Sequence, residues 1–250
     1  NILAGKTAPP PRPSAENCLT TRESVLAKTC ISPPRTVPFC HKVFLWFAAV
    51  ADFMERIFII HGWGGTAASG WKGWLRGELA RRGWQVHSPQ MPNAENPRMD
   101  EWLSVLSGLV GKPDSETYLA GHSLGCIAIL RYLEGLEANE KIGGAVLVAG
   151  FSDDLGMPEL KDFFPRPFDF GKIKSRCKKF VALHSTDDRY VDVKYGREFE
   201  AKLGAKLVVL HNMGHFSHSE GINELPSALK ALLLLAGEER QIRERESDLN

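Results

Sequence analysis

The chain contains a serine between two closely spaced glycines, in the stretch Gly-His-Ser-Leu-Gly at positions 121–125. The apolar run at 118–120 precedes this stretch and a helical pattern at 126–136 follows it, so the serine falls at a turn from strand to helix. Such a turn exposes the serine hydroxyl at the edge of a sheet, and the glycines let neighbouring backbone approach without Cβ clashes. The amino end of the following helix favours a developing negative charge. Ser123 is therefore the candidate nucleophile.

A serine hydroxyl is a weak nucleophile and needs a neighbouring base. The histidine that best fits this role is His215, which follows the last predicted strand in the stretch Asn-Met-Gly-His-Phe at 212–216. The glycine before it allows the loop to turn so that the imidazole points toward Ser123. His211 closes the preceding strand and His218 lies one turn further on, so we expect both to be structural or exposed.

The carboxylate that would orient this base is expected in the loop at 185–191, Ser-Thr-Asp-Asp-Arg-Tyr-Val, which follows the fifth predicted strand. This loop contains two adjacent aspartates, Asp187 and Asp188, which cannot both face one imidazole. The other aspartate would cap the turn or accept backbone N–H groups. A carboxylate in this position holds the imidazole in the useful tautomer and stabilises the imidazolium that forms during attack.

A second glycine-rich stretch, His-Gly-Trp-Gly-Gly at 61–65, follows the first predicted strand. In acyl-transfer enzymes with this arrangement, one oxyanion donor comes from such a loop and the other from the residue after the nucleophile. We assign these donors to the backbone N–H groups of Trp63 and Leu124. Losing one such donor typically costs about 3 to 4 kcal/mol of transition-state stabilisation. The alternative, a phosphate-binding loop, is disfavoured because neither glycine-rich nucleotide pattern is completed here.

The elements that must position these residues are short apolar runs that alternate with amphipathic stretches from residue 56 onward. Strands rich in Val, Ile and Leu, separated by helical patterns, indicate βαβ units around a parallel sheet, with helices on both faces. We therefore predict a doubly wound α/β sheet of about six parallel strands. The predicted strands are 56–61, 84–88, 117–120, 144–149, 179–184 and 206–211, and the predicted helices are 71–82, 98–110, 124–136, 193–203 and 222–235.

The segment 151–177 interrupts this alternation between the fourth and fifth strands. It is too rich in proline for one regular helix, and a doubly wound sheet accepts an insertion over the carboxyl ends of its strands at this point. We interpret it as a short lid, and the alternative is a surface loop that adds a little to the core. A lid of this kind favours a small or medium apolar acyl group over a long lipid. The side chains expected to wall its apolar pocket are Phe151, Phe163, Phe164 and Phe168.

The two ends of the chain differ from its middle. Residues 1–53 are rich in proline and are predicted to be a disordered extension, residues 54–237 the folded domain, and residues 238–250 a charged tail. The apolar run at 43–50 is about eight residues long, against roughly 20 needed to span a bilayer, so we interpret it as non-targeting. Five cysteines without a secretory signature favour a reducing cytoplasm.

Three alternatives to acyl transfer on Ser123 concern nucleic-acid or membrane binding, metal chemistry and binding without turnover. A net charge of +1 gives no field that would attract nucleic acid or an anionic membrane, so the basic residues at 172–179 are interpreted as a solvated helix face. His211, His215 and His218 have a spacing that resembles metal ligands, but the Glu of an H-E-x-x-H motif is missing, and no metal is expected. The third alternative is a hydrolase fold that serves as a binding module without turnover, because a fold alone does not establish chemistry.

From about residue 54 to residue 237, the chain resembles the small serine hydrolases of the α/β-hydrolase type that are related to retinoblastoma-binding protein 9 and bacterial YdeN. The resemblance rests on short motifs that occur in one order along the chain. These motifs are His61-Gly62, Gly70-Trp71, Trp74-Leu75, Met91-Pro92, Gly121-His122-Ser123, Arg166-Pro167, Lys172-Ile173-Lys174, Ser185-Thr186-Asp187-Asp188 and Gly214-His215-Phe216.

The resemblance implies a compact α/β-hydrolase with a Ser-Asp-His triad, no cofactor and a small-molecule ester or amide substrate cleaved through an acyl-enzyme. The family spacing places the acid three residues before a valine, which selects Asp188, so the triad carries over to Ser123, Asp188 and His215. The N-terminal extension has no counterpart in the family pattern. A retinoblastoma-type partner is not expected, because the nearest match to Leu-x-Cys-x-Glu, at 124–128, lacks the glutamate.

Overall fold

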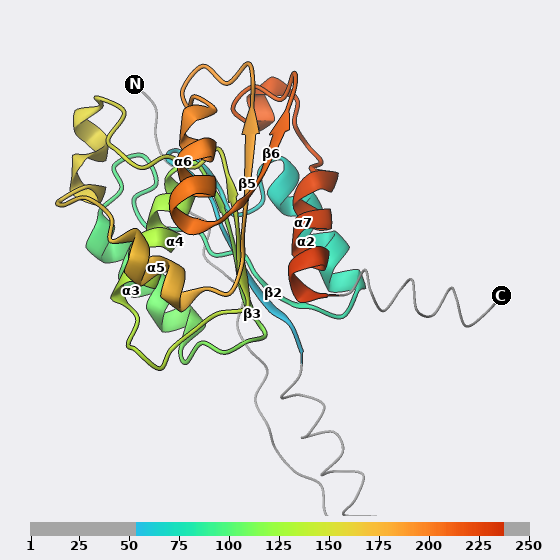
Figure 1. The fold of residues 1–250 in the computed structure, drawn as a ribbon. Helices are drawn as coiled ribbons and strands as arrows, with labels where there is room; N and C mark the ends of the chain where they lie inside the picture. Colours follow the sequence, from blue (N-terminus) through green and yellow to red (C-terminus); the bar gives the residue numbers. More distant parts are fainter. Residues whose placement is uncertain (1–53, 238–250) are drawn as a thin grey trace, which may run out of the picture. The chain divides into compact units, whose positions relative to one another are not determined.

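Six parallel strands form a single sheet in the order β2-β1-β3-β4-β5-β6 (Figure 1). The computed structural model describes residues 54–237, so the predictions for 1–53 and 238–250 lie outside the described residues. The first strand, β1, lies next to the edge strand β2, and the strand order reverses direction after β2, as in a doubly wound fold. The prediction of a doubly wound α/β sheet is therefore confirmed. The strands are β1 (Arg56–Ile60), β2 (Gln85–His87), β3 (Thr117–His122), β4 (Gly144–Val148), β5 (Phe180–Ser185) and β6 (Lys206–Leu210).

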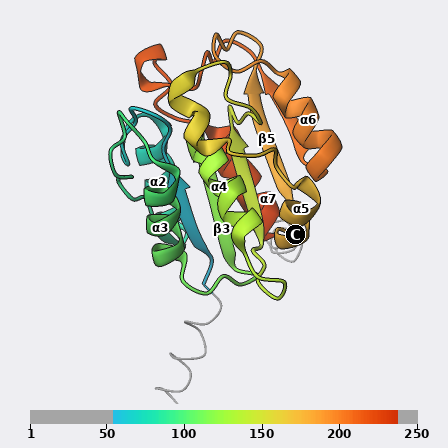
Figure 2. The same cartoon turned by 90° about the vertical axis from the view of Figure 1, so that its left-hand side faces the viewer.

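Helices cover both faces of the sheet, as Figures 1 and 2 show from two directions. On one face lie α2 (Trp71–Arg81) and α7 (Pro226–Ala236), and on the other lie α3 (Met99–Val110), α4 (Leu124–Gly135), α5 (Phe170–Arg176) and α6 (Lys194–Leu203). Every residue of β3, β4 and β5 is buried between these layers. This burial explains why the central strands are continuous apolar runs rather than alternating ones.

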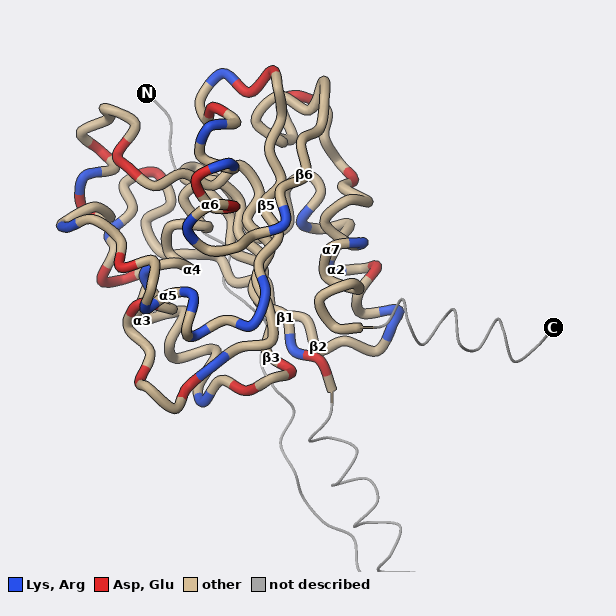
Figure 3. Tube along the Cα trace, viewed as in Figure 1, with Lys and Arg blue, Asp and Glu red and all other residues tan. Residues whose placement is uncertain are grey.

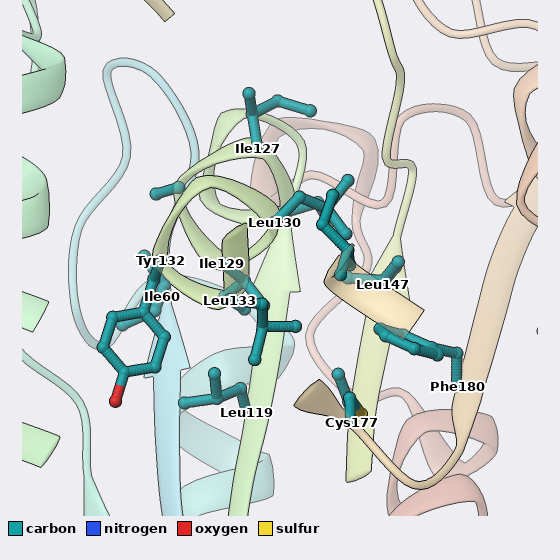
Figure 4. Close-up of a cluster of buried hydrophobic side chains, with 14 of the residues drawn as sticks. Ile60, Leu119, Ile127, Ile129, Leu130, Tyr132, Leu133, Leu147, Cys177 and Phe180 are labelled. Atoms are coloured by element: carbon teal, nitrogen blue, oxygen red, sulfur yellow. The ribbon is translucent and has the colours of Figure 1, made fainter. Parts of the chain in front are cut away.

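Helix α4 lies at the centre of one layer, and every residue from Leu124 to Glu134 is buried. It packs on the sheet with one side and on α3, α5 and the segment after β4 with the others. Figure 4 shows Ile129, Leu130 and Leu133 of this helix packed among buried side chains of the strands. Burial of each such side chain contributes roughly 1.5 to 3 kcal/mol. The helix that follows Ser123 is therefore held on all sides.

The segment 151–177 contains a short 3-10 helix, η1 (Pro158–Phe163), and then α5. Figure 2 shows η1 in yellow, packed over α4 near the carboxyl ends of the strands. A buried ion pair on α4 holds this segment. Arg131 donates to Glu134 Oε2 (2.8 Å) and to the carbonyl oxygens of Phe163 (3.0 Å) and Arg166 (2.5 Å), while Glu134 Oε1 accepts from the Asp169 N–H (2.8 Å). The side chains of Arg131 and Glu134 thus bind the insertion to α4 through hydrogen bonds to its main chain.

The last helix is shorter than predicted. The pattern at 222–235 predicted one helix, but α7 begins at Pro226, and a 3-10 turn, η2 (His218–Glu220), lies before it. Proline lacks a backbone N–H and is favoured in the first turn of a helix, which explains the later start. The loop between β6 and α7 therefore has the length needed to reach the carboxyl ends of the neighbouring strands.

Acidic and basic residues are interspersed along most elements of the described part (Figure 3). Lysines gather near the turn between α5 and β5, where Lys178 and Lys179 follow Arg176. Between residues 54 and 237, none of the helices combines the length and the apolar character required to cross a membrane.

Candidate active site

The turn at Ser123 has the strained geometry that a strand-to-helix elbow requires. Ser123 has φ 52° and ψ −121°, and its N–H donates to the Val148 carbonyl oxygen at 2.9 Å. A positive φ is unusual for a residue other than glycine and is maintained only by the surrounding contacts. A Cβ on Gly121 would lie 2.6 Å from the Cys126 nitrogen, and one on Gly125 would lie 2.7 Å from the His61 carbonyl oxygen. Both glycines are therefore required by close backbone packing.

Ser123 and His215 line the same cavity, which has a volume of about 320 Å³ and lies where the loops after β1, β3, β4, β5 and β6 meet. A volume of this order suits a small organic ligand. The structure therefore brings together the serine and the histidine that the sequence singled out. The cavity is lined by Trp63, Ser123, Leu124, Phe151, Leu155, Met157, Leu160, Tyr190, Val191, His215, Ser217 and Ser219.

Asp188 is the aspartate that contacts the histidine. Its Oδ2 lies 2.8 Å from His215 Nδ1, and its side chain is 1% exposed. The other carboxylate oxygen accepts the N–H groups of Tyr190 (2.9 Å) and Val191 (3.0 Å), which fix its orientation. Because a carboxylate accepts, Nδ1 of His215 carries the proton and Nε2 is left as the basic nitrogen.

Asp187 holds a different part of the structure. Its Oδ1 accepts from the Ser185 hydroxyl (2.5 Å) and from the N–H groups of Met213 (3.2 Å) and Gly214 (3.3 Å). The hydrogen bond from Ser185 is the main cause that lowers the pKa of Asp187 below its ordinary value. The two adjacent carboxylates thus divide their contacts, one to the imidazole and one to the backbone that carries it.

Two residues near His215 were not identified from the sequence. His122 Nε2 lies 2.7 Å from the His215 carbonyl oxygen, and Glu220 Oε2 accepts the His215 N–H at 2.8 Å. Burial is the main cause that lowers the pKa of His122 well below its ordinary value, so its neutral ring donates from Nε2. The Ser-x-x-Glu pattern at 217–220 is a capping-box signature that could have identified Glu220. His122 belongs to the motif at 121–123, but nothing in the sequence predicts its contact with the His215 carbonyl oxygen.

The two expected oxyanion donors lie beside Ser123. Trp63 follows β1 and Leu124 is the first residue of α4, and both line the cavity. Within the described part of the chain, neither backbone N–H donates to another protein group. A Cβ on Gly62 would lie 3.0 Å from the Ser123 Cβ, so the loop at 61–65 is packed directly against the serine turn.

Only one of the four phenylalanines that were expected to wall the pocket does so. Phe151 lines the cavity, whereas Phe163, Phe164 and Phe168 do not. Phe163 is fully buried against Trp102, with ring centroids 5.7 Å apart, and the Phe168 ring lies 3.9 Å from the Arg131 guanidinium. The Phe164 ring also lies beside the Arg131 guanidinium, at 6.0 Å, so the expectation for these three residues is corrected. The apolar wall is formed instead by Leu155, Met157 and Leu160 of the same segment.

The two other histidines of this loop region are held by separate contacts. His211 Nδ1 lies 2.9 Å from Thr186 Oγ1, and His218 Nδ1 lies 2.6 Å from Asn223 Oδ1. Neither lines the cavity. Among residues 54–237, no three potential metal-binding side chains are grouped so that they could hold an ion.

A family model described as serine hydrolase matches residues 57–233. The chain belongs to the serine hydrolase family. The serine hydrolase RBBP9 of Rattus norvegicus is 32% identical to this chain over 176 residues, which cover 69% of the chain and 91% of the rat protein. YdeN of Bacillus subtilis is 35% identical over 173 residues, which cover 69% of the chain and 91% of YdeN. The resemblance inferred from the motifs is therefore confirmed.

Two solved structures are similar to this chain in fold. The crystal structure of the YdeN gene product has a TM-score of 0.68 at 34% identity and covers 73% of this chain and 98% of its own. A hydrolase of the α/β superfamily from Xanthomonas campestris has a TM-score of 0.52 at 15% identity, covers 75% of this chain and 98% of its own, and is similar in fold alone. The α/β-hydrolase fold is thus shown.

Proposed function

We propose that this serine hydrolase cleaves small to medium carboxylic esters, and related amides, through an acyl-enzyme formed on Ser123. Asp188 and His215 would complete the catalytic triad. The observation that carries this proposal is the 2.8 Å contact between Asp188 Oδ2 and His215 Nδ1 at a cavity that Ser123 also lines. This arrangement gives the imidazole a buried anionic partner on one nitrogen and leaves the other nitrogen available as a base.

In the proposed cycle, Ser123 attacks the carbonyl carbon while His215 Nε2 takes the hydroxyl proton. The backbone N–H groups of Trp63 and Leu124 donate to the oxyanion that develops on the carbonyl oxygen. His215 then protonates the leaving alcohol or amine, and the acyl group remains on Ser123. Water attacks the acyl-enzyme by the same route and releases the acid. Asp188 accepts from Nδ1 throughout and stabilises the imidazolium.

The lining of the cavity supports an apolar acyl group of limited size. Phe151, Leu155, Met157 and Leu160 form an apolar wall, while Ser217 and Ser219 supply hydroxyl groups elsewhere in the same cavity. Apolar walls with a few polar groups are typical of small-molecule sites, where the polar groups set orientation. The preferred substrates would therefore be esters with short to medium acyl chains rather than long lipids.

The test combines active-site labelling with turnover. A fluorophosphonate probe and a series of chromogenic esters and amides of increasing acyl length are applied to the wild type, Ser123→Ala and the matched control Ser219→Ala, which changes another serine of the same cavity. We expect labelling and turnover to be lost in Ser123→Ala, with a fall in kcat of at least about 10⁴-fold, and to persist in Ser219→Ala. Equal labelling of wild type and Ser123→Ala, or no turnover by the wild type, would instead favour the binding-module alternative.

A further inference from the structure

We propose that Glu220 is a positioning residue for His215, because its carboxylate holds the backbone nitrogen of the proposed base. The inference rests on the proposed function, since it assigns a support to the proposed base. Glu220 lies in η2, outside every motif that carries the family resemblance.

The carboxylate of Glu220 collects three donors from the backbone and side chain around His215. Its Oε2 accepts from the His215 N–H at 2.8 Å, the Ser217 N–H at 3.1 Å and the Ser217 hydroxyl at 2.6 Å. These contacts close a short loop on itself, so the backbone nitrogen of His215 is held by a charged acceptor. Hydrogen bonds to an ionised acceptor are stronger than those between neutral groups.

Gly214 shows that this carboxylate is packed against the residue before the base. A Cβ on Gly214 would lie 2.5 Å from Glu220 Cδ, and Gly214 has φ +49°. A side chain at this position would therefore displace the carboxylate as well as strain the backbone. Glu220 therefore occupies the space in which a side chain at position 214, just before the histidine, would lie.

His215 is thus supported at three separate points. Its N–H donates to Glu220, its carbonyl oxygen accepts from His122, and its Nδ1 donates to Asp188. These supports come from the loop after β6, from β3 and from the loop after β5, so a displacement of any one moves Nε2 relative to Ser123. A misplacement of about 1 Å in such a group can cost about 10²-fold in rate.

The carboxylate of Glu220 is ionised at neutral pH. Burial alone would raise its pKa, but the hydrogen bonds from Ser217 and from the His215 N–H outweigh burial and hold the pKa of Glu220 below its ordinary value. The His215 N–H therefore donates to a charged acceptor.

The experiment compares Glu220→Ala and Glu220→Gln with the wild type. The concentration of active sites is first determined by titrating a separate sample with a fluorophosphonate. Each kcat is then expressed per active site. We expect Glu220→Ala to lower kcat about 10- to 100-fold with little change in KM, because positioning of the base is lost. Glu220→Gln keeps an acceptor oxygen and should recover most of kcat.

The matched control is Glu224→Gln, which removes the same charge from an exposed position of the same loop. It should leave kcat and KM unchanged. The inference is overturned if Glu220→Ala keeps the wild-type kcat per active site, or if Glu220→Gln loses as much of kcat as Glu220→Ala does. Ser123-dependent labelling of the wild type is measured in the same preparations, so its absence would identify a failure of the proposed function instead.

Discussion

His122 and His215 are joined across the site, because Nε2 of His122 lies 2.7 Å from the carbonyl oxygen of His215. Their ring centroids are 5.0 Å apart, and the His122 ring also packs edge-on against Trp71. The residue before the proposed nucleophile thus supports the residue proposed as its base. A movement of the serine turn would therefore displace the loop that carries His215.

Replacing His122 tests this support. His122→Leu removes the donor to the His215 carbonyl oxygen and should lower kcat about 10- to 100-fold, whereas His122→Gln can still donate and should lose less. Steady-state kinetics on a short-chain ester measure both. Because burial keeps His122 neutral at neutral and mildly acidic pH, neither variant should remove the acidic limb of the pH profile. A Leu variant with wild-type kcat would argue against the support.

The two adjacent aspartates should separate clearly in kinetics. Asp188→Asn removes the acceptor for His215 Nδ1–H, and such a change in a Ser-His-Asp triad lowers kcat by about 10⁴-fold. Asp187→Asn weakens the acceptor for the Ser185 hydroxyl and for the Met213 and Gly214 N–H groups but leaves the Asp188 contact in place, and we expect a loss of about tenfold. The measurement is kcat/KM for both variants in one buffer. Equal losses, or a larger loss in Asp187→Asn, would reverse the assignment of the acid.

Gly125 should not accept a side chain. A Cβ there would lie 2.7 Å from the His61 carbonyl oxygen and would overlap the Ile60 carbonyl oxygen as well. Backbone cannot yield as a side chain can, so Gly125→Ala should lower the free energy of unfolding by about 3 kcal/mol. Gly108→Ala in α3 is the control, because nothing lies within 4 Å of its added Cβ, and it should stabilise by about 1 kcal/mol. Urea denaturation of both variants decides, and equal effects would contradict the packing argument.

Lys72 gives a prediction for stability against pH. It is 4% exposed, and burial lowers its pKa from 10.5 to about 8. Between these values the unfolded chain binds more protons than the folded one, so the stability of the wild type should rise as pH rises from about 8 to 10.5. Lys72→Met should remove this rise and should be more stable at pH 7, by at most about 3 kcal/mol.

The control for this measurement is Lys112→Met, which replaces an exposed lysine. It should leave the slope of unfolding free energy against pH unchanged. Denaturant melts at pH 7, 8, 9 and 10 supply the slope for each protein. If the wild type shows no rise above pH 8, the ammonium of Lys72 is not desolvated in the folded state.

The parts of the site that the sequence predicted are those with a local signature. The glycines at 121 and 125 indicate a tight turn between an apolar run and a helical pattern, and the buried strands β3, β4 and β5 are continuous apolar runs. The histidine follows a strand in an expected chain order. These features are properties of short stretches, so they can be read without knowing the tertiary contacts.

The parts that were missed depend on contacts between distant stretches. The segment 151–177 has no period, so nothing in it distinguishes a phenylalanine that faces the cavity from one that packs on Arg131. The burial of Arg131 is equally hidden, because an arginine on a helix is usually exposed. The contact of His122 with His215 also forms only once β3 and the loop after β6 are side by side.

The ion pair under the insertion has a consequence for how substrate enters. Because Arg131 and Glu134 bind the main chain at Phe163, Arg166 and Asp169, the insertion is anchored to α4 just after the residues that wall the cavity. We therefore expect substrate to reach the cavity without an oil–water interface that rearranges the insertion. The rate of hydrolysis should follow dissolved substrate smoothly through the solubility limit, without the jump that marks interfacial activation in lipases.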